Sequence, residues 1–315
     1  MLSIIKHFIT SSSTALSLSK KQGFLNFFNI FNIRFLYAFS LIRNNFNKTK
    51  KNDKKNINSS EDHFTTSIGS EKIIDDLSSI GYNDKLEIKP DLMKKIISEI
   101  NLKNSTIYLK GEKKVKDFIK NATIEDDLNS ILMKSKKNHL SHVVLEIDIK
   151  KTNYIKDLAD SEFFLNIARN YIGGKNISIV SQCYISNPIN IQEIEKKNNA
   201  QYFHYDLDYK KFFKVFIYLN NVDSNNGPHQ FVVSTNLNKK FKHIVAERID
   251  DIEIKKNYEK IKIFEGNSGQ VIIEDTFGLH KGEWPKKNSR LMLVLIYGHE
   301  MGLNNFKYPI LKKMN

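Results

Sequence analysis

Four polar residues in the second half of the chain have the types and spacing of a metal site with an anion clamp. The only His-x-Asp of the sequence joins His204 and Asp206, shortly before the strand-like run Lys214–Leu219. Residues two apart on an extended chain point to the same face, so this imidazole and carboxylate can reach one ion. His280 follows 74 residues after Asp206, and Arg290 comes ten residues later. The pattern predicts a mononuclear metal centre.

The ligand types indicate which metal and which second ligand to expect. Two histidines and one carboxylate on one face of iron(II) leave three positions open, as in the facial triad of non-haem iron oxygenases. A 2-oxo acid fills two of them and leaves the third for dioxygen. Its distant carboxylate then needs a counter-charge, and Arg290 suits that role because a guanidinium binds a carboxylate through two hydrogen bonds and keeps its charge. We therefore expect iron(II), dioxygen and a 2-oxo acid cosubstrate.

Other polar residues near the motif have weaker signals. Gln182 and Tyr184 share one face of a predicted strand and could hydrogen-bond the cosubstrate, with an ordinary core or surface role as the alternative. Asp208 and Lys214 flank the triad with opposite charges, which suits a structural pair or a substrate contact. His229 follows a Gly-Pro pair and is expected to be a turn residue rather than a fourth ligand.

Composition limits the class of protein. A length of 315 residues suits one sizeable domain plus an extension. The single cysteine, Cys183, excludes an internal disulfide and is expected to be a buried strand residue in a reducing compartment. The net charge of +14 is concentrated in residues 1–60, which hold ten Lys and Arg against one Asp. The rest of the chain is therefore only mildly basic, so no nucleic-acid partner is expected.

The first 70 residues read as an extension. The segment Phe24–Ile42 is rich in aromatic residues but carries three asparagines and one arginine, which argue against a bilayer-spanning helix. A helix lying in the membrane interface, aided by the basic run Lys48–Lys55, is one interpretation. A disordered leader and a targeting segment are the alternatives. We expect a cytoplasmic protein, with peripheral membrane contact through residues 1–60 left open, and a polar linker at 49–70.

From residue 71 the pattern is that of a globular domain, 71–315, with a helical lead-in at 71–175 and a core at 176–300. Helices are expected at 71–79, 91–100, 115–120, 124–133 and 160–172, and strands at 143–147, 177–185, 214–219, 230–234, 270–276 and 290–297. Short strands with helices gathered before them predict a mostly β fold with flanking α-helices, a double-stranded β-helix of the jelly-roll or cupin type. An insertion at 237–271, partly helical over 250–263, is expected to cap the barrel mouth.

The sequence resembles one family over about 100 residues. The stretches FHYDLDYKKFFKVFIYLNNVDSNNGPHQFVVSTN (203–236) and GNSGQVIIEDTFGLHKGEWPKKNSRLMLVLIY (266–297) are similar to the phytanoyl-CoA dioxygenase family of Fe(II)/2-oxoglutarate-dependent oxygenases. The resemblance implies His204, Asp206 and His280 as metal ligands and Arg290 as the anchor of 2-oxoglutarate. It also implies hydroxylation of a C–H bond with release of succinate and CO2. Gly282 departs from the pattern, since some members have a hydroxyl there that helps hold the cosubstrate.

Three functional hypotheses follow. The first is a 2-oxoglutarate-dependent hydroxylase of a small or lipid-linked metabolite. The second is a cupin-like iron protein that does not use 2-oxoglutarate. Arg290 distinguishes the first hypothesis from the second, because only a carboxylate cosubstrate needs an arginine at that place. The third is a non-enzymatic adaptor at a membrane surface, for which His204 and His280 would be dispensable. The sequence names no substrate and no oligomeric state.

Overall fold

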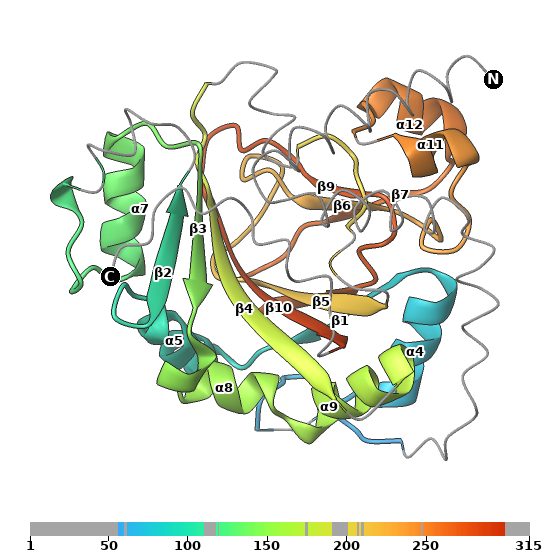
Figure 1. Cartoon of the computed structure of the whole chain (residues 1–315), viewed down its shortest axis with the longest axis horizontal. Coiled ribbons are helices and arrows are strands. Elements are labelled where there is room, and N and C mark those ends of the chain that lie inside the picture. Colours follow the sequence, from blue (N-terminus) through green and yellow to red (C-terminus); the bar gives the residue numbers. More distant parts are fainter. Residues whose placement is uncertain are drawn as a thin grey trace, which may run out of the picture.

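The computed structural model describes residues 56–59, 62–109, 118, 120–173, 176–190, 201–206, 208, 211–246 and 248–299. Its strands form two antiparallel sheets, a seven-stranded sheet in the order β1-β8-β5-β10-β4-β3-β2 and a three-stranded sheet in the order β7-β6-β9 (Figure 1). The strands are β1 Tyr82–Glu87, β2 Ser105–Leu109, β3 His142–Ile147, β4 Ile177–Ser186, β5 Phe212–Tyr218, β6 His229–Val232, β7 Ile261–Phe264, β8 Gln270–Glu274, β9 His280–Gly282 and β10 Arg290–His299. The predicted double-sheet jelly roll with flanking helices is confirmed.

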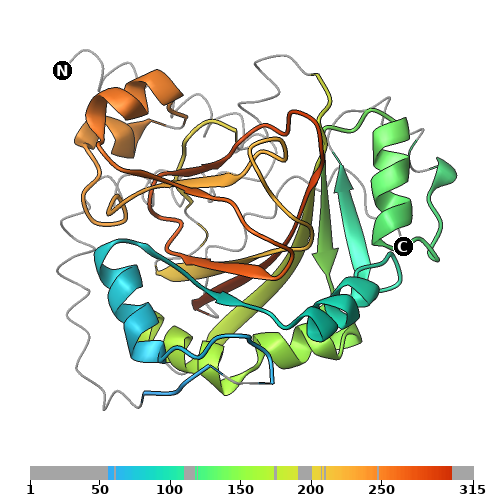
Figure 2. The same ribbon diagram turned by 180° about the vertical axis from the view of Figure 1, so that it is seen from behind.

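The helices come mainly before the core strands, as the sequence predicts. They are α4 Ser70–Ser79, α5 Pro90–Glu99, α7 Leu128–Lys137, α8 Tyr154–Ala159, α9 Glu162–Ala168, α11 Phe241–Val245 and α12 Asp251–Asn257, with a 3-10 turn at Ile149–Lys151 and a π turn at Arg169–Gly173. Figures 1 and 2 show α4, α5, α8 and α9 together along one side of the seven-stranded sheet, with the three-stranded sheet on the other side.

Side-chain alternation gives the large sheet two different faces. On β5, Val215 and Ile217 belong to the apolar core shared with the helices, whereas Phe216 and Tyr218 belong to the cluster between the two sheets. Burying an aliphatic side chain of this kind stabilises the fold by roughly 1.5–3 kcal/mol. The helix-covered face, which we call the outer face, therefore provides most of the apolar core. The inner face, toward the small sheet, carries the polar groups described below.

Local capping explains where two helices differ from the sequence prediction. The helix expected at 124–133 is observed as α7, four residues later, because the Asp127 side chain accepts a hydrogen bond from the Ser130 amide at 2.8 Å and caps the helix there. The helix expected at 160–172 begins at Glu162 after Ser161, whose hydroxyl caps the Phe164 amide. Gly173 ends the following π turn with a φ of +81°.

Several strands were not expected from the sequence. They are β1, β2, β7 and β9, each short or rich in polar residues. The last residues of the segment expected to be partly helical, 250–263, instead form β7, which pairs with β6. In that segment Ile254 of α12 packs with Val232 and Leu279 on the face of the small sheet turned away from the large sheet. Ile254 thus packs the segment against the small sheet, and the expectation that the segment caps the barrel mouth stays a prediction.

The packed chain begins before the expected boundary at residue 71. Phe64 is 2% exposed, forms a bridge with Ile88 and lies 5.9 Å from the rings of both Phe163 and Phe164. The end of the segment expected as a linker is therefore part of the core. The aromatic segment at 24–42 and most of the helix expected at 115–120 lie outside the described residues. Among the residues that the structure describes, no helix is long and apolar enough to cross a bilayer.

Candidate metal centre

Backbone pairing places the two histidines side by side. His204 and His280 form an antiparallel bridge, in which the His204 amide donates to the His280 carbonyl at 3.0 Å and the His280 amide donates back at 2.8 Å. The Asp206 amide donates to the Thr276 carbonyl at 2.8 Å, which holds the next turn of the chain against the segment leading into β9. Three residues that are up to 76 positions apart in sequence are thus positioned by main-chain hydrogen bonds.

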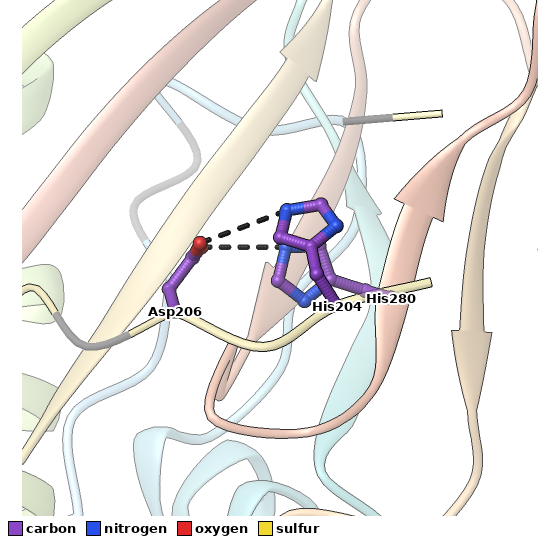
Figure 3. Close-up of side chains that lie close together, drawn as sticks. All are labelled: His204, Asp206 and His280. Atoms are coloured by element: carbon purple, nitrogen blue, oxygen red, sulfur yellow. Dashed lines mark ion pairs between the residues drawn. The ribbon is translucent and has the colours of Figure 1, made fainter. Parts of the chain in front are cut away.

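The three side chains converge on one point (Figure 3). One ligand atom from each of His204, Asp206 and His280 lies within 4.8 Å of the others. The Asp206 carboxylate oxygens are 3.7 Å from His204 Nε2 and 3.3 Å from His280 Nε2. The two imidazole rings are 4.4 Å apart between centroids, and both histidines are at most 7% exposed. Among the described residues this is the one group of three or more His, Cys, Asp or Glu with metal-site spacing.

Hydrogen bonds from the other ring nitrogen orient both imidazoles. His204 Nδ1 lies 2.9 Å from the Tyr202 carbonyl oxygen, and His280 Nδ1 lies 3.0 Å from the Gly278 carbonyl oxygen. A carbonyl only accepts, so each Nδ1 carries the proton and donates it. In its neutral form each imidazole then has its lone pair on Nε2, the nitrogen that faces Asp206, and this is the tautomer that a metal ligand requires.

A buried lysine balances the carboxylate. Lys214 of β5 places its ammonium 2.8 Å from Asp206 Oδ2 and 2.7 Å from Asp208 Oδ2. Burial opposes ionisation of Asp206, but the charges of Lys214 and His280 outweigh it and hold the pKa of this carboxyl well below its ordinary value. For Asp208, burial dominates and raises the pKa. Asp206 is thus the anionic ligand, and the lysine takes part in holding it.

The two histidines differ electrostatically. Burial, followed by the charge of His280, lowers the pKa of His204 well below 6.5, so this imidazole is neutral at neutral pH. For His280 burial acts in the same direction, but Asp206 and then Glu274 outweigh it and raise the pKa. Without a metal, His280 and Asp206 therefore attract each other as an ion pair. A divalent cation between them would take over the role of the proton on His280.

A second buried acid, which sequence reasoning missed, lies behind the histidines. Glu274 ends β8 with no exposed surface, accepts from or donates to His229 Nε2 at 2.8 Å, and lies 3.8 Å from His280 Nδ1. Burial raises the pKa of Glu274 to about 8. His229 is the first residue of β6 rather than a turn residue, and its ring is 5.6 Å from that of His280. Glu274 ends a strand of mostly apolar residues, so the sequence does not mark it as a site residue. Only the pairing of β8 with β5 shows that it lies near the histidines.

Arg290 lies on the same side of β9 as His280. A Cβ placed on Gly282 would approach Arg290 Nη2 to 2.4 Å, so the glycine leaves room for the guanidinium. Residues 280 and 282 share a face because they are two apart on a strand. Arg290 is 5% exposed, donates to the carbonyls of Gly227 and Glu283, and has a buried Nε without a hydrogen-bond partner. Among the described residues no carboxylate pairs with it.

This geometry explains the departure at Gly282. The position two after the distal histidine holds no hydroxyl because the arginine side chain fills that volume. The guanidinium has its carbonyl contacts on one side, and the partnerless Nε is a buried donor that a carboxylate could satisfy. The site therefore combines three metal-binding groups with the buried guanidinium of Arg290, which lies beside Gly282, two residues after His280 on β9.

The remaining predicted residues lie on β4 and are less directly involved. Gln182 and Tyr184 share the inner face, where the Tyr184 hydroxyl donates to Gln182 Oε1 at 2.7 Å. They pair in register with Val294 and Met292 of β10, so they border the strand that begins at Arg290. Cys183 points to the outer face and is fully buried, which raises the pKa of its thiol to about 12. That thiol is part of the core, as expected.

Comparisons with known proteins complete the description. The sequence matches no family model and no curated protein sequence. Solved structures with a similar arrangement include AviO1 from Streptomyces viridochromogenes, at 14% identity and a TM-score of 0.44 over 76% of this chain and 98% of that one. The non-heme alpha ketoglutarate dependent carbocyclase SnoK from nogalamycin biosynthesis has 11% identity and a TM-score of 0.49, over 78% and 93%. HygX from Streptomyces hygroscopicus, with nickel and 2-oxoglutarate bound, has 10% identity and a TM-score of 0.44, over 73% of this chain and 87% of that one.

At these identities and TM-scores the likenesses do not decide what this chain binds or does. The resemblance to the phytanoyl-CoA dioxygenase family likewise stays a prediction, because no family model matches. The functional argument therefore depends on the site itself.

Proposed function

We propose that this protein is an iron(II)- and 2-oxoglutarate-dependent oxygenase that hydroxylates a C–H bond of a small or lipid-linked metabolite. The observation that carries the proposal is the combination of two features on one face of β9. His280 completes a buried cluster of two imidazoles and one carboxylate, and Arg290 places a buried guanidinium beside Gly282 on the same face. Two histidines and a carboxylate are the donor set of non-haem iron(II) oxygenases.

The residues present fit both groups. His204, His280 and Asp206 would hold iron(II), and Arg290 would bind the distant carboxylate of 2-oxoglutarate through its partnerless Nε–H and a neighbouring N–H. Bound iron and 2-oxoglutarate would supply the oxidising power, with dioxygen consumed and succinate and CO2 released. The chain itself supplies ligand geometry, a counter-charge and a site shielded from water by Phe216, Phe264 and their neighbours. A cupin-like protein without 2-oxoglutarate gives no role to the partnerless Nε–H of Arg290.

The test is an anaerobic titration of the full chain with iron(II) and then 2-oxoglutarate. We expect the weak visible charge-transfer band of the iron chelate in the natural protein. For Arg290→Ala, the 2-oxoglutarate concentration that gives half of the maximal band intensity should rise at least about tenfold, because charge-assisted hydrogen bonds of about 1.5–3 kcal/mol are lost. Lys287→Ala, which removes an equal charge from an exposed position, should titrate like the natural protein.

Two results would overturn the proposal in different ways. Bound iron with no band would remove 2-oxoglutarate and favour the cupin-like alternative. Failure to bind iron at all would remove the enzyme hypothesis, and the membrane-surface adaptor would become the leading one. Localisation in the cytoplasm and contact of residues 1–60 with a membrane are separate proposals, which fractionation of cells expressing the full chain and the chain without residues 1–55 would test.

A further inference from the structure

The imidazole of His229 lies beside the guanidinium of Arg290. In the small sheet His229 of β6 is the cross-strand partner of Gly282 of β9, and directly opposite residues of such a pair have Cβ positions about 5 Å apart (Figure 1). The Arg290 guanidinium fills the space on the side-chain face of Gly282. Its Nη1 also donates to the carbonyl of Gly227, two residues before His229. The two side chains are therefore neighbours on the inner face.

One nitrogen of the His229 imidazole is used and the other is not. Nε2 lies 2.8 Å from Glu274 Oε2, and the ring packs against those of Phe216 and Phe264 at centroid distances of 4.7 and 5.8 Å. Within the described part of the chain Nδ1 makes no hydrogen bond, although His229 is only 3% exposed. In a side chain this buried, a nitrogen without a partner is available to a ligand that enters the site.

The pairing with Glu274 makes Nδ1 a donor. Burial raises the pKa of Glu274 to about 8, and burial with the charges of His280 and Arg290 lowers the pKa of His229 well below 6.5. At neutral pH the acid is then uncharged and donates to Nε2, so the neutral imidazole has its proton on Nδ1. An uncharged donor can lie beside a guanidinium without charge repulsion.

A carboxylate bound to Arg290 has room for further donors. It has about four lone-pair positions, of which a guanidinium fills two at most. Two other polar side chains near Arg290 are less suited to the rest. The Tyr218 hydroxyl already donates to the Phe264 carbonyl at 2.7 Å. Ser186 is the cross-strand partner of Arg290 on β4, so it lies near the backbone of the arginine, whereas the guanidinium extends to the small sheet. His229 is the better placed donor.

We propose that His229 is a second binding residue for the distant carboxylate of 2-oxoglutarate, with its Nδ1–H donating to the carboxylate that Arg290 holds. This proposal rests on the proposed function, because it takes the metal and Arg290 to bind 2-oxoglutarate. Glu274 is then a positioning residue, since its hydrogen bond to Nε2 orients the imidazole. The carboxylate is held from both sheets, by Arg290 of β10 and by His229 of β6.

The experiment compares two 2-oxo acids that chelate iron(II) through the same atoms. 2-Oxopentanoate has the chain length of 2-oxoglutarate, with a methyl group in place of the distant carboxylate. Each acid is titrated anaerobically into the full chain loaded with iron(II), and the chelate band gives its dissociation constant. We call the ratio of the two constants the carboxylate preference. The natural protein should prefer 2-oxoglutarate, and its affinity for 2-oxopentanoate should not depend on His229.

Two substitutions of His229 separate the two ring nitrogens. His229→Gln keeps an amide near the place of Nε2, where it can bond to Glu274, but has no donor at the place of Nδ1. It should lower the carboxylate preference about tenfold or more, the loss of one hydrogen bond to a charged group. His229→Asn keeps an N–H near the place of Nδ1 and loses the contact with Glu274, so it should keep more of the preference. A merely structural role for His229 predicts the reverse order.

The matched control is His243→Gln on α11. His243 is also a buried histidine paired with a glutamate, with Nε2 3.0 Å from Glu253 Oε1, and it is not one of the residues of the metal site. This variant should keep the full carboxylate preference. Unfolding curves show whether each variant is folded.

The outcomes distinguish this proposal from the proposed function. If the natural protein shows no chelate band, or binds the two acids equally, both are overturned. If Arg290→Ala loses the carboxylate preference while His229→Gln keeps it, the proposed function stands and the role of His229 is overturned. A role for His229 in the carboxylate contact is also overturned if His229→Gln weakens both acids equally.

Discussion

The two faces of the seven-stranded sheet carry different chemistry on the same strands. On β8, Ile273 points to the helices and is fully buried among apolar side chains, whereas Glu274, the next residue, points to the inner face and meets His229. On β5, Val215 and Lys214 differ in the same way. One face is built from groups that stabilise the fold when buried, and the other from groups whose burial costs free energy unless they are paired.

This contrast shows where stability and chemistry are separated in the molecule. On the inner face Lys214 is balanced by Asp206 and Asp208, whereas no carboxylate among the described residues pairs with Arg290. A substitution on the outer face should therefore change the free energy of unfolding and leave the site intact once the chain is folded. A substitution on the inner face should change binding, or should change stability in a way that depends on metal or pH.

The largest expected effect comes from removing a metal ligand. His280→Ala should weaken zinc(II) or iron(II) binding by more than about 100-fold, because even a residue that only orients a ligand is worth 10–100-fold. Metal content after dialysis and equilibrium titration measure this. Its free energy of unfolding without metal should change much less than its metal affinity.

The matched change on the outer face should do the reverse. Ile273→Ala should lower the free energy of unfolding by about 2–5 kcal/mol, since it opens a cavity in the apolar core, and folded protein should bind metal with unchanged affinity. If Ile273→Ala weakened metal binding as much as His280→Ala, the two faces would not be separable.

The next effect in size concerns the buried lysine. Lys214→Met should lower the free energy of unfolding of the metal-free protein by about 3–5 kcal/mol, because Asp206 and Asp208 are left buried without their cation. Saturating zinc(II) should reduce that loss, since the ion supplies positive charge beside Asp206 and binds the variant more tightly. Denaturant unfolding with and without zinc(II) measures both numbers. An equal loss in the two conditions would show that Lys214 does not act through the metal ligand.

The effect expected from Glu274 is small at any one pH step and is distinguished by its dependence on pH. Its pKa is raised to about 8 in the folded protein, against 4.5 for the unfolded chain. Between these values the folded state holds a proton that the unfolded state has released, so this group makes stability fall as pH rises, by at most about 1.4 kcal/mol per pH unit. Glu274→Gln should remove that contribution. Unfolding of metal-free protein at several pH values from 5 to 8 should show a difference between the two proteins that changes with pH; a constant difference would contradict the raised pKa.

Much of the fold could be predicted from local pattern. The strands from 177–185 onward are long runs of β-branched and aromatic residues, and the structure places them within a few residues of the expected bounds. β1 and β9 could not be predicted, because the first is largely polar and the second has three residues. Both exist only through their partners, β8 for the first and β6 for the second. Helix α7 begins four residues after its predicted start, because of two adjacent acids, Asp126 and Asp127, only the second caps the helix.

The residues of the site likewise include some that the sequence predicts and some that it does not. His204 and Asp206 are two apart, so their spacing alone indicated a shared face, and His280 with Arg290 followed from the motif around them. Glu274 carries no local signal, because it reaches the site through pairing of β8 with β5, segments far apart in the sequence. The role of Gly282 could not be predicted from the sequence either, since only the structure shows that Arg290 occupies the space beside it.

The backbone bridge between His204 and His280 has a consequence for which element the protein contains in a cell. Two of the three donors are fixed by main-chain hydrogen bonds, so their separation is set before any ion arrives. Such a pre-arranged pair of imidazoles offers little discrimination by shape among cobalt, nickel, zinc and iron, whose intrinsic affinities for nitrogen and oxygen donors do not favour iron. Iron occupancy would then reflect the supply of ions during synthesis, and protein purified on a nickel column should be expected to carry nickel.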